Sequence, residues 1–229
     1  MQRPRRLLPA LSAILLAMSG HAAAQFMACE SGQAAVQNKL YVTALSLLTR
    51  CLETEGLSGH NLAAALQMRA SAYANTENPV KASEDYRESL RIKPADIAWD
   101  LIPLAIYLRD ADQHVQSLEV LQDALVLDED GPGTGPGLAV YFHLGWTLHE
   151  MRRFGEAIDA YTKGIEKQPL FEGTYLRRAL SHEAMGERGN VRADLLKAID
   201  IGYERGLDPA TAPAEYRAMF LKYGLIPGQ

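Results

Sequence analysis

Residues 138–171 read LAVYFHLGWTLHEMRRFGEAIDAYTKGIEKQPLF, and this stretch decides the fold. Its pattern starts at the small residue Gly145, and 12, 16 and 19 residues later come a small or β-branched, a bulky and another small residue. The same pattern occurs five times, with its first residues spaced by 38, 35, 40 and 34 residues. The sets are Gly32, Ala44, Leu48, Cys51; Ala70, Ala82, Tyr86, Ser89; Ala105, Ser117, Leu121, Ala124; Gly145, Ala157, Tyr161, Gly164; and Ala179, Val191, Leu195, Ala198. A repeat of this length predicts stacked helical hairpins.

The spacing has a direct physical explanation. Two helices approach to about 8 Å only where their side chains are small, so Gly or Ala recurs at each crossing and Tyr or Leu fills the space beside it. One hairpin cannot bury its apolar stripe alone, whereas stacked hairpins cover one another and need caps only at the two ends. The alternative is an irregular helical bundle whose pattern repeats by chance. This is disfavoured because four kinds of position agree across all five sets.

The pattern resembles the tetratricopeptide repeat, a helix–turn–helix unit that stacks into a superhelix. Carried onto this chain, the resemblance implies an all-α, right-handed superhelical solenoid of about five hairpins. The units are residues 25–58, 63–96, 98–131, 138–171 and 172–205. The fourth unit fits best, the second has Arg69 in place of the usual Leu, and the first is weakest because small residues replace large ones on its first helix.

The first 24 residues have the composition of a secretory signal. Three arginines precede a short apolar run from Leu7 to Met18, and Ala22, Ala23 and Ala24 follow. The run is too short to span a membrane, and no later stretch approaches the ~18 apolar residues that a span needs. Cleavage after Ala24 would leave 205 residues with a net charge of −8. We therefore expect an exported, periplasmic protein without stable membrane insertion, and no basic cluster indicates nucleic acid.

The predicted export bears on the state of the two cysteines. Cys29 and Cys51 fall on the two helices of the first unit, about equally far from a turn near Leu40. A disulfide between them is geometrically plausible in an oxidising compartment. Two alternatives stay open: a pair of small buried thiols, or a lipoprotein in which Cys29 carries the lipid anchor.

The connections and the C-terminus complete the predicted organisation. Residues 131–137, GPGTGPG, exclude helix and form either a surface loop or a flexible joint, while residues 59–62 are a smaller insertion between units. In residues 206–229, Pro213 opens a last helix that Gly224 ends. Its stripe of Tyr216, Met219, Phe220 and Tyr223 should cap the fifth unit, in preference to a membrane-surface helix, because basic residues are few.

The resemblance also places a candidate binding groove. In the family, the first helices line a concave side, and fixed positions of each unit face it. The groove positions of units three to five carry Trp99, Ile102, Ile106, Arg109, Asp110, Ala139, Phe142, Trp146, His149, Glu150, Leu176, Leu180 and Glu183. This half of the groove is aromatic and apolar, which suits an apolar segment of a partner, although the tryptophans could instead pack into the core. The family's basic clamp for terminal carboxylates is missing, since Cys29, Gln67, Ile102, Phe142 and Leu176 occupy its positions.

The sequence contains no motif for catalysis, metal or cofactor binding. The six histidines form no HExxH, and phosphate-binding loops and nucleophile elbows are missing. We therefore expect no catalytic residues, metal or cofactor, and interpret the chain as a non-enzymatic scaffold that binds a protein or peptide in the cell envelope. The alternatives are a structural accessory subunit of an envelope or secretion assembly, which uses its convex face and caps, and, more distantly, an enzyme or a carrier of a small apolar ligand.

Overall fold

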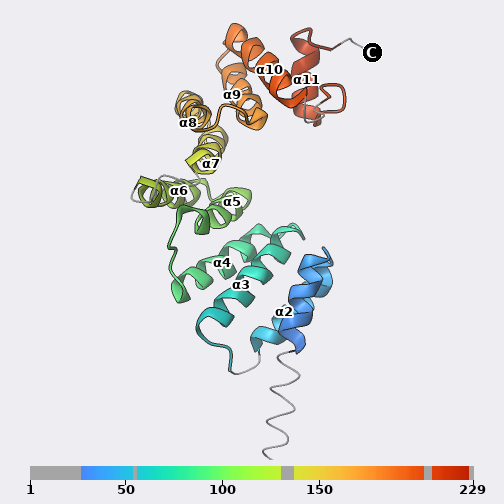
Figure 1. The fold of residues 1–229 in the computed structure, drawn as a ribbon, viewed down its shortest axis with the longest axis vertical. Helices are drawn as coiled ribbons and strands as arrows, with labels where there is room; N and C mark the ends of the chain where they lie inside the picture. The colour runs from blue at the N-terminus through green and yellow to red at the C-terminus, as the bar shows by residue number, and fades with distance from the viewer. Residues whose placement is uncertain (1–26, 54–55, 130–136, 204–207, 227–229) are drawn as a thin grey trace, which may run out of the picture. The chain divides into compact units, whose positions relative to one another are not determined.

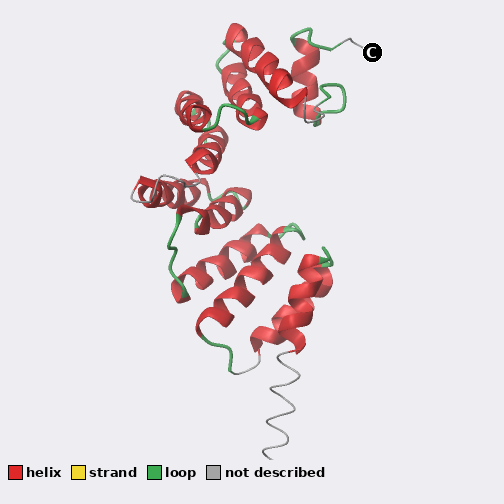
Figure 2. Cartoon of the chain, in the orientation of Figure 1, coloured by secondary structure: helices red, strands yellow, loops and turns green. Residues whose placement is uncertain are grey.

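The computed structural model describes residues 27–53, 56–129, 137–203 and 208–226, and every regular element in these ranges is helical (Figure 2). The predicted signal segment 1–24 and nearly all of the Gly-Pro segment lie outside the described residues. Two compact units divide the chain, one up to Pro94 and one from Ala95 onward. No described helix combines the length and the apolar character needed to cross a membrane.

The first unit contains two hairpins. Residues 27–37 are helical and precede α2 (Tyr41–Glu53), and the turn between them lies at residues 38–40, as predicted. The second hairpin joins α3 (Gly59–Ala74) to α4 (Pro79–Ile92), which lie side by side (Figure 1). Pro79 suits the start of α4 because a first-turn residue needs no backbone N–H, and the Asn78 side chain accepts a hydrogen bond from the Lys81 amide.

The second unit continues the same alternation. Its elements are η1 (Ala98–Asp100), α5 (Ile102–Asp110), α6 (His114–Glu129), α7 (Gly137–Glu150), α8 (Phe154–Lys167), α9 (Glu172–Ala184), α10 (Arg188–Tyr203) and α11 (Ala214–Lys222). Within it α7 contacts both α5 and α9, so the first helices of three successive hairpins are neighbours.

The recurring small and bulky positions form the core, as predicted. All twenty residues of the five sets are buried. Gly145 shows why: a Cβ built on it would lie 2.6 Å from the Tyr161 ring, and one on Gly32 would lie 2.8 Å from Leu48. Larger residues at these two positions would therefore push the paired helices apart.

One predicted boundary was wrong, and one hairpin has a divided first helix. Residues 59–62, expected as an insertion, belong to α3, because Ser58 takes an extended N-cap conformation and the helix begins one turn earlier. The third unit, which spans residues 98–131, begins with η1, and its first α-helix is the short α5. Pro103 lies in the first turn of α5 and cannot donate a backbone hydrogen bond to a preceding turn, so the helix starts again just before it.

The last helix packs as a cap. Tyr216, Met219 and Phe220 are buried in one cluster with residues of α9 and α10, and Tyr223 packs against it. Glu183 of α9 also accepts hydrogen bonds from Lys222 and Tyr223. Gly224 follows the helix with φ of 67°, the left-handed conformation that favours glycine at a helix end.

Cys29 and Cys51 form a disulfide, with an S–S distance of 2.02 Å and a sequence separation of 22. The sequence left open a disulfide, two buried thiols or a lipid anchor on Cys29, and the structure has the disulfide. The bond joins the helix of residues 27–37 to α2 at a point where Cys51 is buried against Ala28 and Ala65. A sulfur in this bond is not available to carry a lipid, so the structure disagrees with an anchor on Cys29.

Candidate functional site

A stack of side chains connects the three neighbouring first helices of the second unit. The guanidinium carbon of Arg109, from α5, lies 3.9 Å from the centre of the Trp146 ring of α7. That of Arg177, from α9, lies 3.5 Å from the same centre. Two guanidinium groups this close to one centre would overlap on a single ring face, so they cover opposite faces. The half-buried indole is therefore held between two cations.

Carboxylates surround this stack. Arg109 donates two hydrogen bonds to Asp110, at 2.8 and 3.2 Å, and Arg177 lies 3.6 Å from Glu215 of α11. The indole N–H of Trp146 donates to Glu150, at 3.0 Å. We call these six residues the first-helix face: Arg109, Asp110, Trp146, Glu150, Arg177 and Glu215. Its arginines are largely covered, with 6% and 14% of their side chains exposed, whereas its carboxylates are exposed to solvent.

His143 lies beside the stack and is held neutral. Its ring is nearly parallel to that of Trp146, and its Nδ1 accepts a hydrogen bond from Arg109 at 3.3 Å, which places the proton of the neutral ring on Nε2. Burial lowers the pKa of His143 to about 4, and the charges of Arg109 and Arg177 act in the same direction. A proton on this ring would be both desolvated and repelled by two cations.

Phe142 forms the apolar border of the stack. Its ring makes edge contacts with Trp146, Phe171 and Tyr161, with centroid distances of 6.0, 5.6 and 6.3 Å. The hydroxyl of Tyr161 is buried and has no hydrogen-bond partner among the described residues, and burial raises its pKa. Phe142 and Tyr161 thus connect the first-helix face to the hairpin core.

The structure separates the predicted groove residues into two groups. Arg109, Phe142 and Trp146 come together as described, and Ile106, His149, Leu180 and Glu183 are partly exposed on the same three helices. Ile102 and Leu176 are only 5% and 6% exposed and pack in hydrophobic clusters. The expectation that these two side chains line a groove is therefore corrected. Both lie on the side of the helix that faces its hairpin partner.

The two tryptophans do not form the exposed aromatic wall that the sequence indicated. Trp99 is 53% exposed, but it belongs to η1 and has no ring or cation contact among the described residues. Trp146 is neither an open platform nor a core residue, because arginines cover its two ring faces. The surface of this region is consequently more polar than predicted.

Three residues of the site were missed from the sequence. They are His143, Arg177 and Glu215. Arg177 stands beside Arg178, and adjacent residues on a helix point about 100° apart, so only one can face the hairpin partner. The sequence contained part of this signal, because Arg69 and Arg178 share one repeat position, so Arg177 must point to another side of α9.

One pair has the residue types of a nucleophile and base. His149 Nδ1 lies 2.9 Å from the Ser181 hydroxyl. Ser181 is fully buried in α9, however, so its hydroxyl is closed to solvent. The hydrogen bond between His149 and Ser181 connects α7 to α9. Within the described ranges, no group of three or more His, Cys, Asp or Glu residues could hold a metal ion.

Comparisons with known proteins agree with this geometry. A family model for the tetratricopeptide repeat matches residues 63–96 and 138–169, the second and fourth repeat units. Residues 63–96 and 138–169 of this chain are tetratricopeptide repeats. The resemblance stated from the sequence is thereby confirmed, and the described helices follow the hairpin pattern of these repeats.

Solved structures of MamA share the fold of this chain. The structure titled "MamA 41-end from Desulfovibrio magneticus RS-1" is 14% identical with a TM-score of 0.66, over 80% of this chain and 98% of that one. "Crystal structure of MamA protein" is 19% identical with a TM-score of 0.63, over 83% and 98%. A search of curated proteins found no match. At these identities the likeness establishes the fold alone.

Proposed function

We propose that this protein is an exported, non-enzymatic scaffold that binds a protein or peptide partner in the cell envelope through its first-helix face. The stack of Arg109, Trp146 and Arg177 carries the proposal. It joins three successive hairpins on the side that lines the concave surface in tetratricopeptide repeats, and it fixes side chains that would otherwise be mobile. A surface ordered in advance loses less conformational entropy when a partner binds.

The polarity of the face indicates the kind of partner. The groups that reach solvent are the carboxylates Asp110, Glu150 and Glu215, while the two arginines are covered. A partner segment with basic side chains therefore fits this surface better than the purely apolar segment expected from the sequence. Electrostatic complementarity of this kind speeds association and selects the partner.

Two features support export. Residues 1–24 have the charged start, apolar middle and small-residue exit of a secretory signal. The Cys29–Cys51 disulfide suits an oxidising compartment such as the periplasm.

Charge-neutral variants test the binding face. Asp110→Asn, Glu150→Gln and Glu215→Gln combined should weaken capture of the partner from an envelope extract at least about tenfold. The matched control combines Glu84→Gln, Asp123→Asn and Glu166→Gln, three exposed carboxylates on second helices, and should leave capture unchanged.

A photo-crosslinking residue at position 150 should capture the same partner, and one at Arg192, exposed on α10, should not. Equal loss in both triple variants, or crosslinks only from position 192, would instead favour an accessory subunit that assembles through its other surface. A mature N-terminus other than Gln25, determined by intact mass, would contradict the predicted cleavage.

A further inference from the structure

An arginine-centred contact recurs in two hairpins far apart in the sequence. Arg69 of α3 donates to both oxygens of Asp85 on α4, at 2.7 and 2.8 Å, and reaches Thr49 on α2, at 3.4 Å. Arg178 of α9 likewise donates to both oxygens of Asp194 on α10, at 2.9 and 2.7 Å, and to Thr162 on α8, at 3.0 Å.

Each contact spans what we call a seam, the space between the second helices of two consecutive hairpins, floored by the first helix between them. Both arginines are the seventh residue of their unit, and both aspartates are the twenty-third. The threonines are the twenty-fifth residue of the preceding unit. The arginine thus uses its stem to fill the seam and its guanidinium to join two hairpins.

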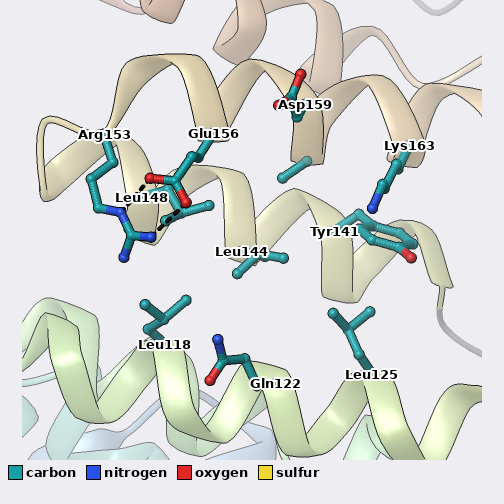
Figure 3. Close-up of a pocket in the computed structure, with 11 residues that line it drawn as sticks. Leu118, Gln122, Leu125, Tyr141, Leu144, Leu148, Arg153, Glu156, Asp159 and Lys163 are labelled. Atoms are coloured by element: carbon teal, nitrogen blue, oxygen red, sulfur yellow. Dashed lines mark hydrogen bonds and ion pairs between the residues drawn. The ribbon is translucent and has the colours of Figure 1, made fainter.

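The seam between α6 and α8 lacks this contact. In the fourth unit, Leu144 stands in place of the arginine and Ala160 in place of the aspartate, and in the preceding unit Gln122 stands in place of the threonine. Leucine and alanine are smaller than the residues they replace. A pocket of about 340 Å³ lies here, and Leu144, Ala160 and Gln122 all line it (Figure 3).

The floor of the pocket is apolar. Leu118 and Leu125 of α6 face Leu144 and Leu148 of α7 across it (Figure 3). The stem of a long side chain could pack along this floor as the stems of Arg69 and Arg178 do in their own seams.

The charges on the rim are mostly satisfied within the chain. Arg153 is paired with Glu156 through two hydrogen bonds, and Lys163 lies over the Tyr141 ring, 5.9 Å from its centre. Asp159 also lines the pocket from α8, is exposed, and has no ion pair or hydrogen bond among the described residues. The charge left for a ligand is therefore a single carboxylate, one residue before the position that holds an aspartate in the seams of Arg69 and Arg178.

We propose that this pocket receives an arginine side chain from a partner polypeptide. Its methylene stem packs on the leucine floor, and its guanidinium donates to the Asp159 carboxylate, which is free to turn because it is exposed, and to the Gln122 side-chain oxygen. The partner's arginine completes in this seam the contact that Arg69 and Arg178 make in theirs. The pocket is lined by α6, α7 and α8 and shares no residue with the first-helix face, so the inference does not depend on the proposed function.

A methyl NMR titration of the full mature chain tests the proposal. The probe is an acetylated and amidated Gly-Ala-Arg-Ala-Gly peptide, with otherwise identical peptides that carry citrulline or lysine as comparisons. The arginine peptide should shift the methyl signals of Leu118, Leu144 and Leu148. Citrulline keeps the shape but loses the charge, and lysine loses the planar fork, so both should bind at least about fivefold more weakly.

Two variants separate the pocket from other surfaces. Asp159→Asn should weaken the arginine peptide about fivefold or more, while Glu166→Gln, an exposed carboxylate on the same helix, should not. The triple change Leu144→Arg, Ala160→Asp and Gln122→Thr rebuilds the internal contact, so the chain's own arginine should fill the pocket and abolish binding. Asp159→Asn keeps the test decisive if the triple variant fails to fold.

Several results would overturn the proposal. They are unshifted leucine methyls, equal binding of the citrulline peptide, or binding that survives both Asp159→Asn and a folded triple variant. Methyl shifts that grow with protein concentration in the absence of peptide would identify a second copy of the chain as the occupant, and would overturn it as well.

Discussion

The guanidinium carbon of Arg177 lies 3.5 Å from the centre of the Trp146 ring, so a side chain of α9 closes one face of an aromatic ring carried by α7. With Arg109 on the other face, the contact extends from the third hairpin to the fifth. Neighbouring repeats are thus joined through their first helices by stacking as well as by apolar burial.

We predict that Arg177 and Trp146 are energetically coupled. In a double-mutant cycle of Arg177→Ala and Trp146→Ala, the coupling free energy should be about 1 kcal/mol, because a largely covered cation faces the ring. Urea unfolding of the four proteins measures it. The control cycle pairs Trp146→Ala with Arg192→Ala, an exposed arginine of α10, and should show additivity within about 0.5 kcal/mol. Additivity in the first cycle as well would show that the stack adds no stability.

Gly145 should tolerate no side chain. The Cβ of Gly145→Ala would meet three Tyr161 ring atoms at 2.6 to 2.8 Å, so the helices must separate, and we expect a loss of roughly 1–3 kcal/mol of unfolding free energy. Gly155→Ala is the matched control, since a Cβ at Gly155 meets nothing within 4 Å and alanine favours helix, which should stabilise by about 0.5–1 kcal/mol. Thermal melts monitored by circular dichroism compare the two. A stable Gly145→Ala protein would contradict the close crossing.

The disulfide should stabilise the N-terminal hairpin. Closing a loop of 22 residues restricts the unfolded chain, and its reduction should lower stability by about 3 kcal/mol. Melting curves with and without reductant measure the change, and a Cys29→Ser, Cys51→Ser variant should melt low in both conditions. Intact mass under non-reducing conditions provides the control, because two free thiols add two hydrogens to the mass. An unchanged melting temperature in the presence of reductant would refute a stabilising role of the disulfide.

Acid should destabilise the second unit through His143. The unfolded chain takes up a proton near the ordinary pKa of 6.5, whereas the native state stays neutral down to about pH 4. Stability from this residue is therefore complete above pH 6.5 and is lost as the pH falls toward 4, by at most about 3 kcal/mol. The pKa of His149 is also lowered by burial and adds a loss of the same sign.

His143→Asn isolates this contribution. Asparagine can offer an oxygen to Arg109 where the imidazole offers Nδ1, but it does not titrate. The free energy of unfolding, measured in urea at several pH values between 4 and 7, should depend less on pH in His143→Asn than in wild type. His60→Asn, at an exposed position on α3, should keep the wild-type slope. Parallel curves for all three proteins would exclude His143 as the source.

The repeat pattern alone predicted the hairpins and their core. All five sets are buried, among them Gly145, Ala157, Tyr161 and Gly164. The reason is that a helix crossing accepts only side chains of certain sizes at fixed spacings. The pairing of Cys29 with Cys51 was within reach for the same reason, since equal distances from one turn place two residues level on antiparallel helices. Local deviations from the repeat were not predicted, such as the break in the helix that Pro103 causes before α5.

The candidate site depended on tertiary structure. Periodicity tells which positions face a hairpin partner, and it predicted that Trp146 does not. It carries no information on which side chains of neighbouring hairpins meet, so Arg177 and Glu215 could not be assigned to the same face. The pocket beside Leu144 is a second example: three residues from three helices produce it together, although each is an ordinary residue at its own position. Burial patterns arise within one helix and are visible in its sequence, whereas contacts between repeats depend on how long, flexible side chains pack once the hairpins are stacked.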